Sequence, residues 1–250
     1  MTEPLPIALI PGLLCSPRLY VEQLPDLWRF GPLVIADHTR DDTVAAIARR
    51  ILTVAPPRFA LVGLSMGGYI AFEIMRTSPD RVARLVLLDT SARADTPEQS
   101  DRRRAQIALA QRGRFGEVID QLFTSWAHRS RRNDESLRRI VQRMAEETGP
   151  EAFRRQQTAI MTRPDSRPDL AEIRCPTLVL VGDGDEATSP ERAAEIANGI
   201  ADARLVTIPE CGHLSTLERP QHVTRALVEW LEASESSSDG TTSDQRPSSR

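Results

Sequence analysis

The sequence predicts an α/β protein with a mainly parallel, six-stranded sheet that is flanked by helices and interrupted by a helical insertion. Six short apolar runs are continuous rather than alternating, which is typical of strands buried on both faces of a parallel sheet. Helical patterns lie between most of these runs, and this alternation favours parallel pairing. At 250 residues and 40% hydrophobic composition, the chain is long enough to form one large core.

The expected strands and helices follow one another along the chain with clear boundaries. In chain order, the apolar runs that predict strands are Ile7–Ile10, Leu33–Ala36, Phe59–Val62, Leu85–Leu88, Thr177–Val181 and Arg204–Ile208. The core helices are expected at about 42–54, 66–77, 190–199 and 219–233. Because the strands are expected to be parallel, their carboxyl ends meet at one edge of the sheet, where α/β proteins place their sites.

One segment, residues 91–165, breaks the alternation because it contains no convincing strand. Thr96–Gln99 reads as a capping box with Pro97 at the first helical position. Further helices are expected near 116–127, 134–147 and 151–161. We expect this insertion to form a helical lid over a pocket, and the alternative is a merely solvated helical face. The core then comprises residues 1–90 and 166–233.

Composition excludes several classes of function. The net charge of −3 provides no overall basic field for nucleic acid. No signal peptide is visible, and no run approaches the roughly 18 apolar residues of a membrane span. The three cysteines, Cys15, Cys175 and Cys211, favour reduced thiols in a cytoplasmic protein. Residues 234–250 contain no apolar side chain, so we expect a disordered tail.

A candidate nucleophile lies directly after the third expected strand. The pentapeptide Gly63-Leu64-Ser65-Met66-Gly67 matches the Gly-x-Ser-x-Gly nucleophile elbow, in which serine occupies a strained turn between a strand and a helix. The two glycines leave room where side chains would collide. The helix that follows presents unpaired amides near the serine. The alternative is an ordinary strand-to-helix turn, but the flanking strand and helix favour a nucleophilic Ser65.

A serine hydroxyl needs a base to take its proton, and the chain offers four histidines. His213 lies in a loop after the sixth strand, at the same edge of the sheet as Ser65, so we expect it to be the general base. His222 falls within the last helix and is expected at the surface. His128 lies in the insertion, and His38 follows the second strand without a local motif.

The imidazole in turn needs an acid that holds its tautomer. Asp183 and Asp185 both lie in the turn after the fifth strand, and Asp89 follows the fourth. We favour Asp185 and keep Asp183 and Asp89 as alternatives. Each of them gives the chain order Ser, Asp, His that is typical of one hydrolase fold.

These motifs resemble the α/β-hydrolase superfamily over roughly residues 5–233. The acid turn of that family commonly reads Gly-x-x-Asp, and alignment on Gly182 implies Asp185 as the acid. The family's oxyanion hole implies the backbone amides of Met66, after the nucleophile, and of Leu13, in the loop after the first strand. Many members have His-Gly-x in that loop, whereas this chain has Pro11-Gly12-Leu13. The chain is most similar to small lidded serine esterases and lactonases, such as enol-lactonases and pimeloyl-carrier methyl esterases.

The resemblance implies a serine hydrolase that cleaves a small-molecule carboxylic ester or lactone through an acyl-enzyme, with no cofactor. The alternatives are a thioester or carbon–carbon bond hydrolase with the same residues, or a non-catalytic receptor on this fold. Trp126 and Met161 in the insertion are candidates for lining the substrate pocket. The cysteines and histidines lack the paired spacing of a metal site.

Overall fold

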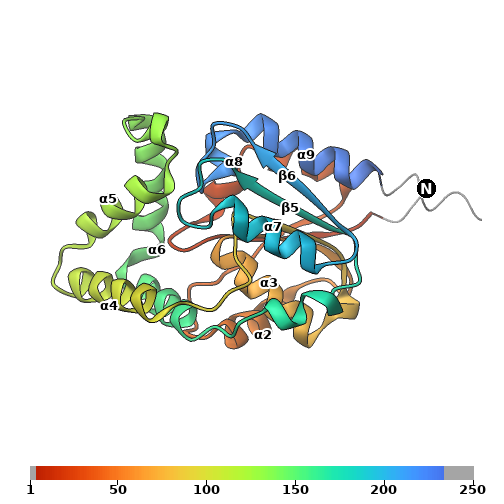
Figure 1. Cartoon of the computed structure of the whole chain (residues 1–250), viewed down its shortest axis with the longest axis horizontal. Coiled ribbons are helices and arrows are strands. Elements are labelled where there is room, and N and C mark those ends of the chain that lie inside the picture. Colours follow the sequence, from red (N-terminus) through yellow and green to blue (C-terminus); the bar gives the residue numbers. More distant parts are fainter. Residues whose placement is uncertain (1–3, 234–250) are drawn as a thin grey trace, which may run out of the picture.

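A six-stranded, wholly parallel sheet lies at the centre of the computed structural model, which describes residues 4–233 (Figure 1). The strand order is β2-β1-β3-β4-β5-β6. The strands are β1 Ile7–Ile10, β2 Leu33–Ile35, β3 Phe59–Leu64, β4 Val82–Leu88, β5 Thr177–Gly182 and β6 Ala203–Ile208. The predicted parallel α/β sheet is therefore confirmed. The expected disordered tail, residues 234–250, falls outside the described residues.

Helices cover both faces of the sheet. α2 (Val44–Val54), α3 (Met66–Thr77) and α7 (Pro190–Gly199) pack on one face, while α1 (Leu24–Leu27) and α9 (Pro220–Ala233) contact each other on the opposite face. Right-handed crossovers require this division, because the chain moves in one direction from β1 to β2 and in the other direction afterwards. The remaining short elements are α8 Ser215–Glu218 and the 3₁₀ turns η1 Pro17–Tyr20, η2 Trp28–Phe30, η3 Pro79–Arg81, η4 Arg129–Arg131 and η5 Arg167–Glu172.

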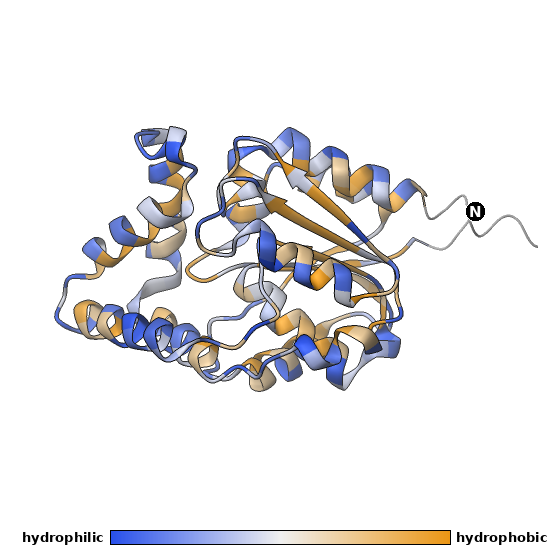
Figure 2. Ribbon diagram, viewed as in Figure 1, coloured by the Kyte–Doolittle hydropathy of each residue, from blue (hydrophilic) through white to orange (hydrophobic). Residues whose placement is uncertain are grey.

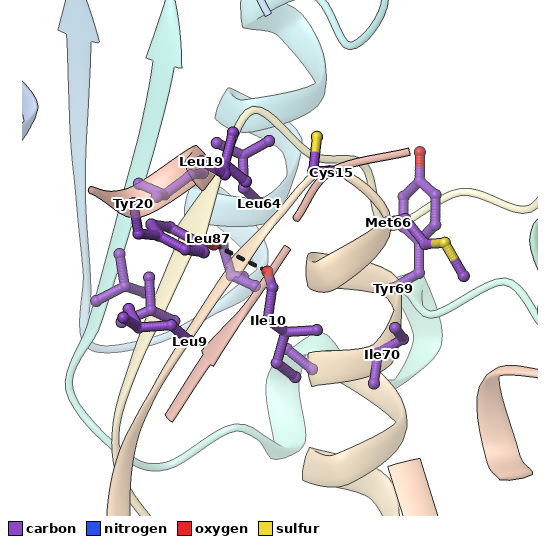
Figure 3. Packing of buried hydrophobic residues seen from close by; sticks show 14 of the residues in the cluster. Leu9, Ile10, Cys15, Leu19, Tyr20, Leu64, Met66, Tyr69, Ile70 and Leu87 are labelled. Atoms are coloured by element: carbon purple, nitrogen blue, oxygen red, sulfur yellow. Dashed lines mark hydrogen bonds between the residues drawn. The ribbon is translucent and has the colours of Figure 1, made fainter. Parts of the chain in front are cut away.

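The apolar core continues to the carboxyl edge of the sheet. β1, β3 and β5 are buried along their whole length, and Figure 2 shows apolar strands beneath helices that carry hydrophilic residues outward. At the edge, the buried Tyr20 hydroxyl donates a 2.8 Å hydrogen bond to the Ile10 carbonyl (Figure 3). Leu9, Leu64 and Leu87 belong to the same cluster. This packing fixes the ends of β1 and β3, from which the candidate site is built.

Between β4 and β5 the chain forms the inserted helices: α4 Pro97–Gln111, α5 Phe115–Trp126 and α6 Glu135–Met161. The predicted capping box is present, because Thr96 Oγ1 accepts from the Gln99 amide at 3.2 Å and Gln99 Oε1 accepts from the Thr96 amide at 2.8 Å. The two helices expected at 134–147 and 151–161 correspond to the two arms of α6, which are separated by a kink at Gly149. Gly149, with φ 79° and ψ 163°, is not helical, and Pro150 has no amide hydrogen to donate, so the first arm ends there and the second begins.

Candidate active site

Ser65 occupies a strained turn between β3 and α3. Its backbone adopts φ 54° and ψ −113°, which a non-glycine residue rarely does. The neighbouring glycines allow this turn to pack. A Cβ on Gly63 would lie 2.4 Å from the Gly67 carbonyl oxygen, and a Cβ on Gly67 would lie 2.1 Å from the Ile10 carbonyl oxygen. The two glycines of the pentapeptide are therefore required by close backbone approach.

A continuous chain of hydrogen bonds joins Ser65 to His213 and Asp185. His213 Nε2 lies 2.8 Å from Ser65 Oγ, and His213 Nδ1 lies 2.9 Å from Asp185 Oδ2. The other carboxylate oxygen of Asp185 accepts hydrogen bonds from the amides of Ala187 and Thr188 at 2.8 and 2.9 Å. The Thr188 hydroxyl also donates to Asp185 Oδ2 at 2.7 Å. Every carboxylate oxygen of Asp185 is thus engaged, which fixes the orientation of the imidazole.

The environment shifts the pKa values of both buried partners. Burial acts to lower the pKa of His213, but the charge of Asp185 and its hydrogen bond outweigh burial and raise that pKa above 6.5. Burial acts to raise the pKa of Asp185, but the charge and hydrogen bond of His213 and the bonds from Thr188 lower it. The pair therefore favours an ionised carboxylate that stabilises a protonated imidazole.

The two alternative acids have other partners. Asp89 is fully buried, accepts the Gly182 amide at 3.0 Å and also accepts the Ser215 hydroxyl. Burial raises the pKa of Asp89 well above its usual value. Asp183 is exposed and accepts the amide of Cys211 at 3.1 Å. Neither carboxylate is hydrogen-bonded to His213, so the structure brings Asp185 to the imidazole and leaves the other two as supports of neighbouring loops.

The loop that carries His213 is anchored to the inserted helices by a residue that the sequence reasoning missed. The His213 amide donates to the Trp126 carbonyl at 2.7 Å. The buried Glu218 carboxylate accepts the amide of His128 at 2.9 Å and that of Leu214 at 3.2 Å. A charged residue directly after the uncharged run 214–217 was the available signal. Glu218 thereby joins the end of α5 to the segment that positions His213.

The loop after β1 approaches the serine closely. A Cβ on Gly12 would lie 3.4 Å from Ser65 Cβ, and Leu13 lines the same cavity as the serine. Within residues 4–233, neither the Leu13 amide nor the Met66 amide has a hydrogen-bond acceptor. His38, which the sequence left without a role, holds the loop because its Nε2 donates to the Gly12 carbonyl at 2.8 Å. Two free amides thus lie beside the candidate nucleophile.

A cavity of about 350 Å³ lies above Ser65 and His213. More than half of its lining residues come from the inserted helices. Of the two pocket residues expected there, Trp126 lines the cavity and Met161 does not. Ile160 takes the place expected for Met161, because adjacent helical residues point about 100° apart. The other residues that line the cavity are Leu13, Tyr69, Gln99, Arg102, Arg103, Gln106, Leu122, Ser125, Glu186, Ala187 and Thr188.

The other groups with reactive chemistry lie apart from this cavity. Cys15 and Cys211 are buried, and burial raises the pKa of Cys15 to about 12 and also raises that of Cys211. Thiols with such high pKa values are unreactive at neutral pH. Within residues 4–233, no cluster of three histidine, cysteine, aspartate or glutamate side chains could hold a metal ion. None of the helices in that range is long and apolar enough to cross a bilayer.

Comparison with known proteins identifies the family of this architecture. The model of the "Alpha/beta hydrolase family" matches residues 7–227. The chain belongs to the alpha/beta hydrolase family. The resemblance inferred from the sequence is thereby confirmed, together with the fold class.

Individual relatives of this α/β hydrolase include esterases and a lactonase. The structure of a thermophilic esterase from Thermogutta terrifontis matches with a TM-score of 0.82 and 31% identity, covering 92% of this chain and 90% of that one. The pimeloyl-[acyl-carrier protein] methyl ester esterase of Nitrosospira multiformis is 26% identical over 224 residues, covering 84% of this chain and 83% of the relative. The enol-lactonase of Burkholderia xenovorans has the same fold, with a TM-score of 0.82 and 24% identity over 91% of each chain. These relatives support a hydrolase.

Proposed function

We propose that this α/β hydrolase is a serine enzyme that cleaves a small carboxylic ester or lactone through an acyl-enzyme intermediate. The hydrogen-bonded chain from Ser65 through His213 to Asp185, at the floor of a cavity, carries the proposal. A nucleophile bonded to a base, and a base oriented by an acid, is the arrangement that activates a serine. The esterase relative at 31% identity supports the same class of reaction.

In the proposed reaction, Ser65 Oγ attacks the substrate carbonyl and its proton passes to His213 Nε2. The carbonyl oxygen becomes an oxyanion between the amides of Leu13 and Met66. The imidazolium, held by Asp185, then gives its proton to the departing alkoxide. Water repeats the sequence on the acyl-enzyme and releases the acid. Each oxyanion donor of this kind contributes about 3 kcal/mol of transition-state stabilisation.

The inserted helices are proposed to act as a lid that shapes the pocket. Residues of α4, α5 and α6 supply most of the cavity wall, whereas the reacting groups come from the sheet edge. A small cavity of about 350 Å³ favours a short acyl or lactone substrate. The free cysteines favour a cytoplasmic enzyme.

Thioester or carbon–carbon hydrolysis would use the same residues, and a non-catalytic receptor would not turn over substrate. A panel of short p-nitrophenyl esters, lactones and acyl thioesters, combined with fluorophosphonate labelling, separates these functions. We expect ester turnover, one label on Ser65, and loss of both in the Ser65→Ala variant. Ser78→Ala, at the far end of α3, is the matched control and should keep full activity. Unlabelled Ser65 with full activity of Ser65→Ala would refute the proposal.

A further inference from the structure

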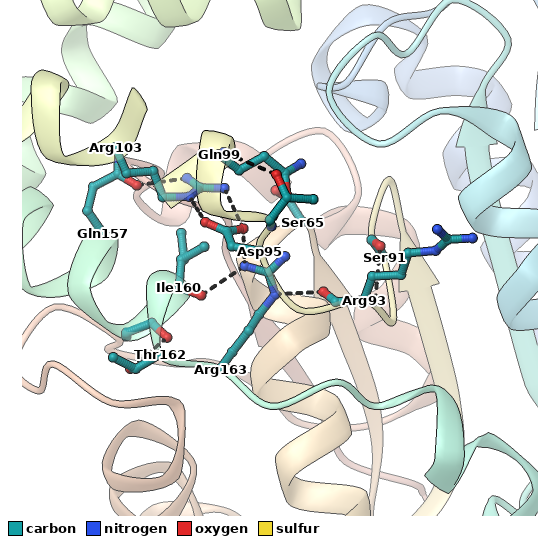
Figure 4. A network of polar contacts seen from close by, with 12 residues as sticks. Ser65, Ser91, Arg93, Asp95, Gln99, Arg103, Gln157, Ile160, Thr162 and Arg163 are labelled. Carbon is teal, nitrogen blue, oxygen red and sulfur yellow. Dashed lines mark hydrogen bonds and ion pairs between the residues drawn. The ribbon is translucent and has the colours of Figure 1, made fainter. Parts of the chain in front are cut away.

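The wall of the cavity contains a buried cluster with an excess positive charge. The Asp95 carboxylate, whose side chain is fully buried, binds two guanidinium groups at once (Figure 4). Arg103 Nε donates to Asp95 Oδ2 at 2.6 Å, and Arg163 Nη1 donates to Asp95 Oδ1 at 2.6 Å. One carboxylate neutralises only one of two arginines, which remain charged at every accessible pH. The cluster therefore carries a net charge of +1.

The other contacts of these arginines supply no negative charge. Arg103 also donates to Gln157 Oε1 at 2.7 Å, and Arg163 donates to the carbonyls of Arg93 and Ile160 at 3.0 and 2.9 Å. The guanidinium of Arg163 stacks over the Tyr69 ring, 4.0 Å from its centroid. These partners satisfy donors but leave the extra charge uncompensated. A partly buried charge without a counterion is costly unless a ligand supplies one.

The excess charge faces the candidate active site. Arg103 and Tyr69 line the same cavity as Ser65. Arg102, one residue earlier on α4, also lines it, and its guanidinium has no hydrogen-bonded acid within residues 4–233. Glu98, one turn before Arg102, is exposed and hydrogen-bonded to Thr96; the charge of Arg102 helps to lower its pKa, but the two side chains form no direct ion pair.

The acid that lines the cavity is already paired with another arginine. Glu186, in the turn that carries Asp185, binds Arg132 at 2.7 Å. The guanidinium groups on α4 are therefore not neutralised from the other side of the cavity. The α4 wall is the positively charged side of the cavity above the serine.

We propose that the substrate carries a carboxylate on its acyl or alcohol part, and that Arg102 and Arg103 bind this group while Ser65 attacks the ester or lactone carbonyl. This inference rests on the proposed serine hydrolase function. A guanidinium fork matches a carboxylate in shape and charge, and the small cavity suits a short half-ester of a dicarboxylic acid. Arg102 and Arg103 are specificity-determining residues in this assignment, and the buried Arg163–Asp95 pair positions Arg103.

The test compares two esters that differ only in charge: mono-p-nitrophenyl adipate and its terminal amide, p-nitrophenyl adipamate. After subtraction of spontaneous hydrolysis, we expect kcat/KM to be at least about tenfold higher for the carboxylate, as one charge-assisted bond provides. Arg102→Gln and Arg103→Gln should each reduce this ratio by about tenfold. Arg104→Gln removes an exposed arginine of α4 that pairs with Asp101 and does not line the cavity, so it should keep the ratio.

Equal kcat/KM for the two esters, with turnover dependent on Ser65, would overturn the carboxylate proposal and leave the hydrolase proposal standing. Absence of turnover and of fluorophosphonate labelling would instead refute the hydrolase. In that case, calorimetry with adipate and adipamide still decides the charge preference: tighter binding of adipate that Arg102→Gln weakens supports it, and equal binding overturns it. If Arg103→Gln fails to fold, Arg102→Gln alone decides the charge preference, because that side chain is exposed and makes no ion pair within 4–233.

Discussion

The sheet edge and the inserted helices face one cavity but are built by different means. At the edge, Ser65, His213 and Asp185 are short side chains on tight turns, and backbone amides hold the carboxylate. Behind the α4 wall, Arg103 of α4 and Arg163, which follows α6, converge on one buried carboxylate. The edge is fixed by the core, which suits the precise positioning that the proposed reaction requires of these groups. The wall lies outside the sheet, so the exposed Arg102 can be changed without altering the sheet edge.

The largest effect is expected from a substitution at the sheet edge that leaves the inserted helices unchanged. Asp185→Asn should lower kcat by about four orders of magnitude, because the amide favours the wrong imidazole tautomer. Asp183→Asn, in the same turn, is the matched control and should stay within about twofold, since Asp183 makes no bond to His213. Steady-state kinetics on a neutral p-nitrophenyl ester measures both. A severe Asp183→Asn defect beside an active Asp185→Asn would contradict the assignment.

A smaller effect is expected where edge and inserted helices are joined. Glu218→Ala leaves two buried amides without an acceptor, which costs about 1–3 kcal/mol of folding stability each. Because the loop of His213 then loosens, kcat should fall about tenfold for both adipate esters while KM changes little. Glu218→Gln keeps one acceptor oxygen and should restore part of kcat. Glu210→Ala, an exposed acid nearby, should change neither kcat nor thermal stability. A Glu218→Ala enzyme with normal kcat would show that the contact is only structural.

The smallest effect is expected in a pH series, because His213 at the sheet edge titrates and the arginines of α4 do not. His213 must be neutral to accept the serine proton, so kcat/KM should fall as pH drops through its pKa, with a midpoint above pH 6.5. The arginines of α4 do not titrate in this range. The ratio of kcat/KM for the carboxylate and amide esters should therefore change by less than about twofold between pH 6 and 9. If this ratio fell together with kcat/KM at low pH, the charge preference would be assigned to His213 at the sheet edge instead of the arginines.

Much of the core could be predicted because its signals are local. Each apolar run gave a strand, and the pentapeptide around Ser65 carried its own turn chemistry. The position of the carboxylate was harder, since Asp183 and Asp185 share one turn and only the folded loop brings Asp185 to the imidazole. The division of α6 at Gly149 could also be predicted, because glycine followed by proline usually ends a helix, and Gly149 is not helical in the structure.

The cavity wall could not be predicted from local pattern. Met161 was expected to line it, but the helical phase gives that place to Ile160. Asp95, Arg103 and Arg163 come from separate segments, and nothing in their spacing shows that two guanidinium groups share one carboxylate. Such a cluster exists only after α4 and α6 have packed together.

The anchoring of His213 limits how freely such an enzyme can be redesigned. The His213 amide bonds to the Trp126 carbonyl, and Glu218 binds the His128 amide, so the end of α5 belongs mechanically to the reacting edge. A chimera in which the inserted helices are replaced by those of another hydrolase must therefore retain the backbone of residues 126–128. The exchangeable part of α4 and α5 therefore ends at residue 125, one residue before the end of α5, and replacing residues beyond it should lower turnover.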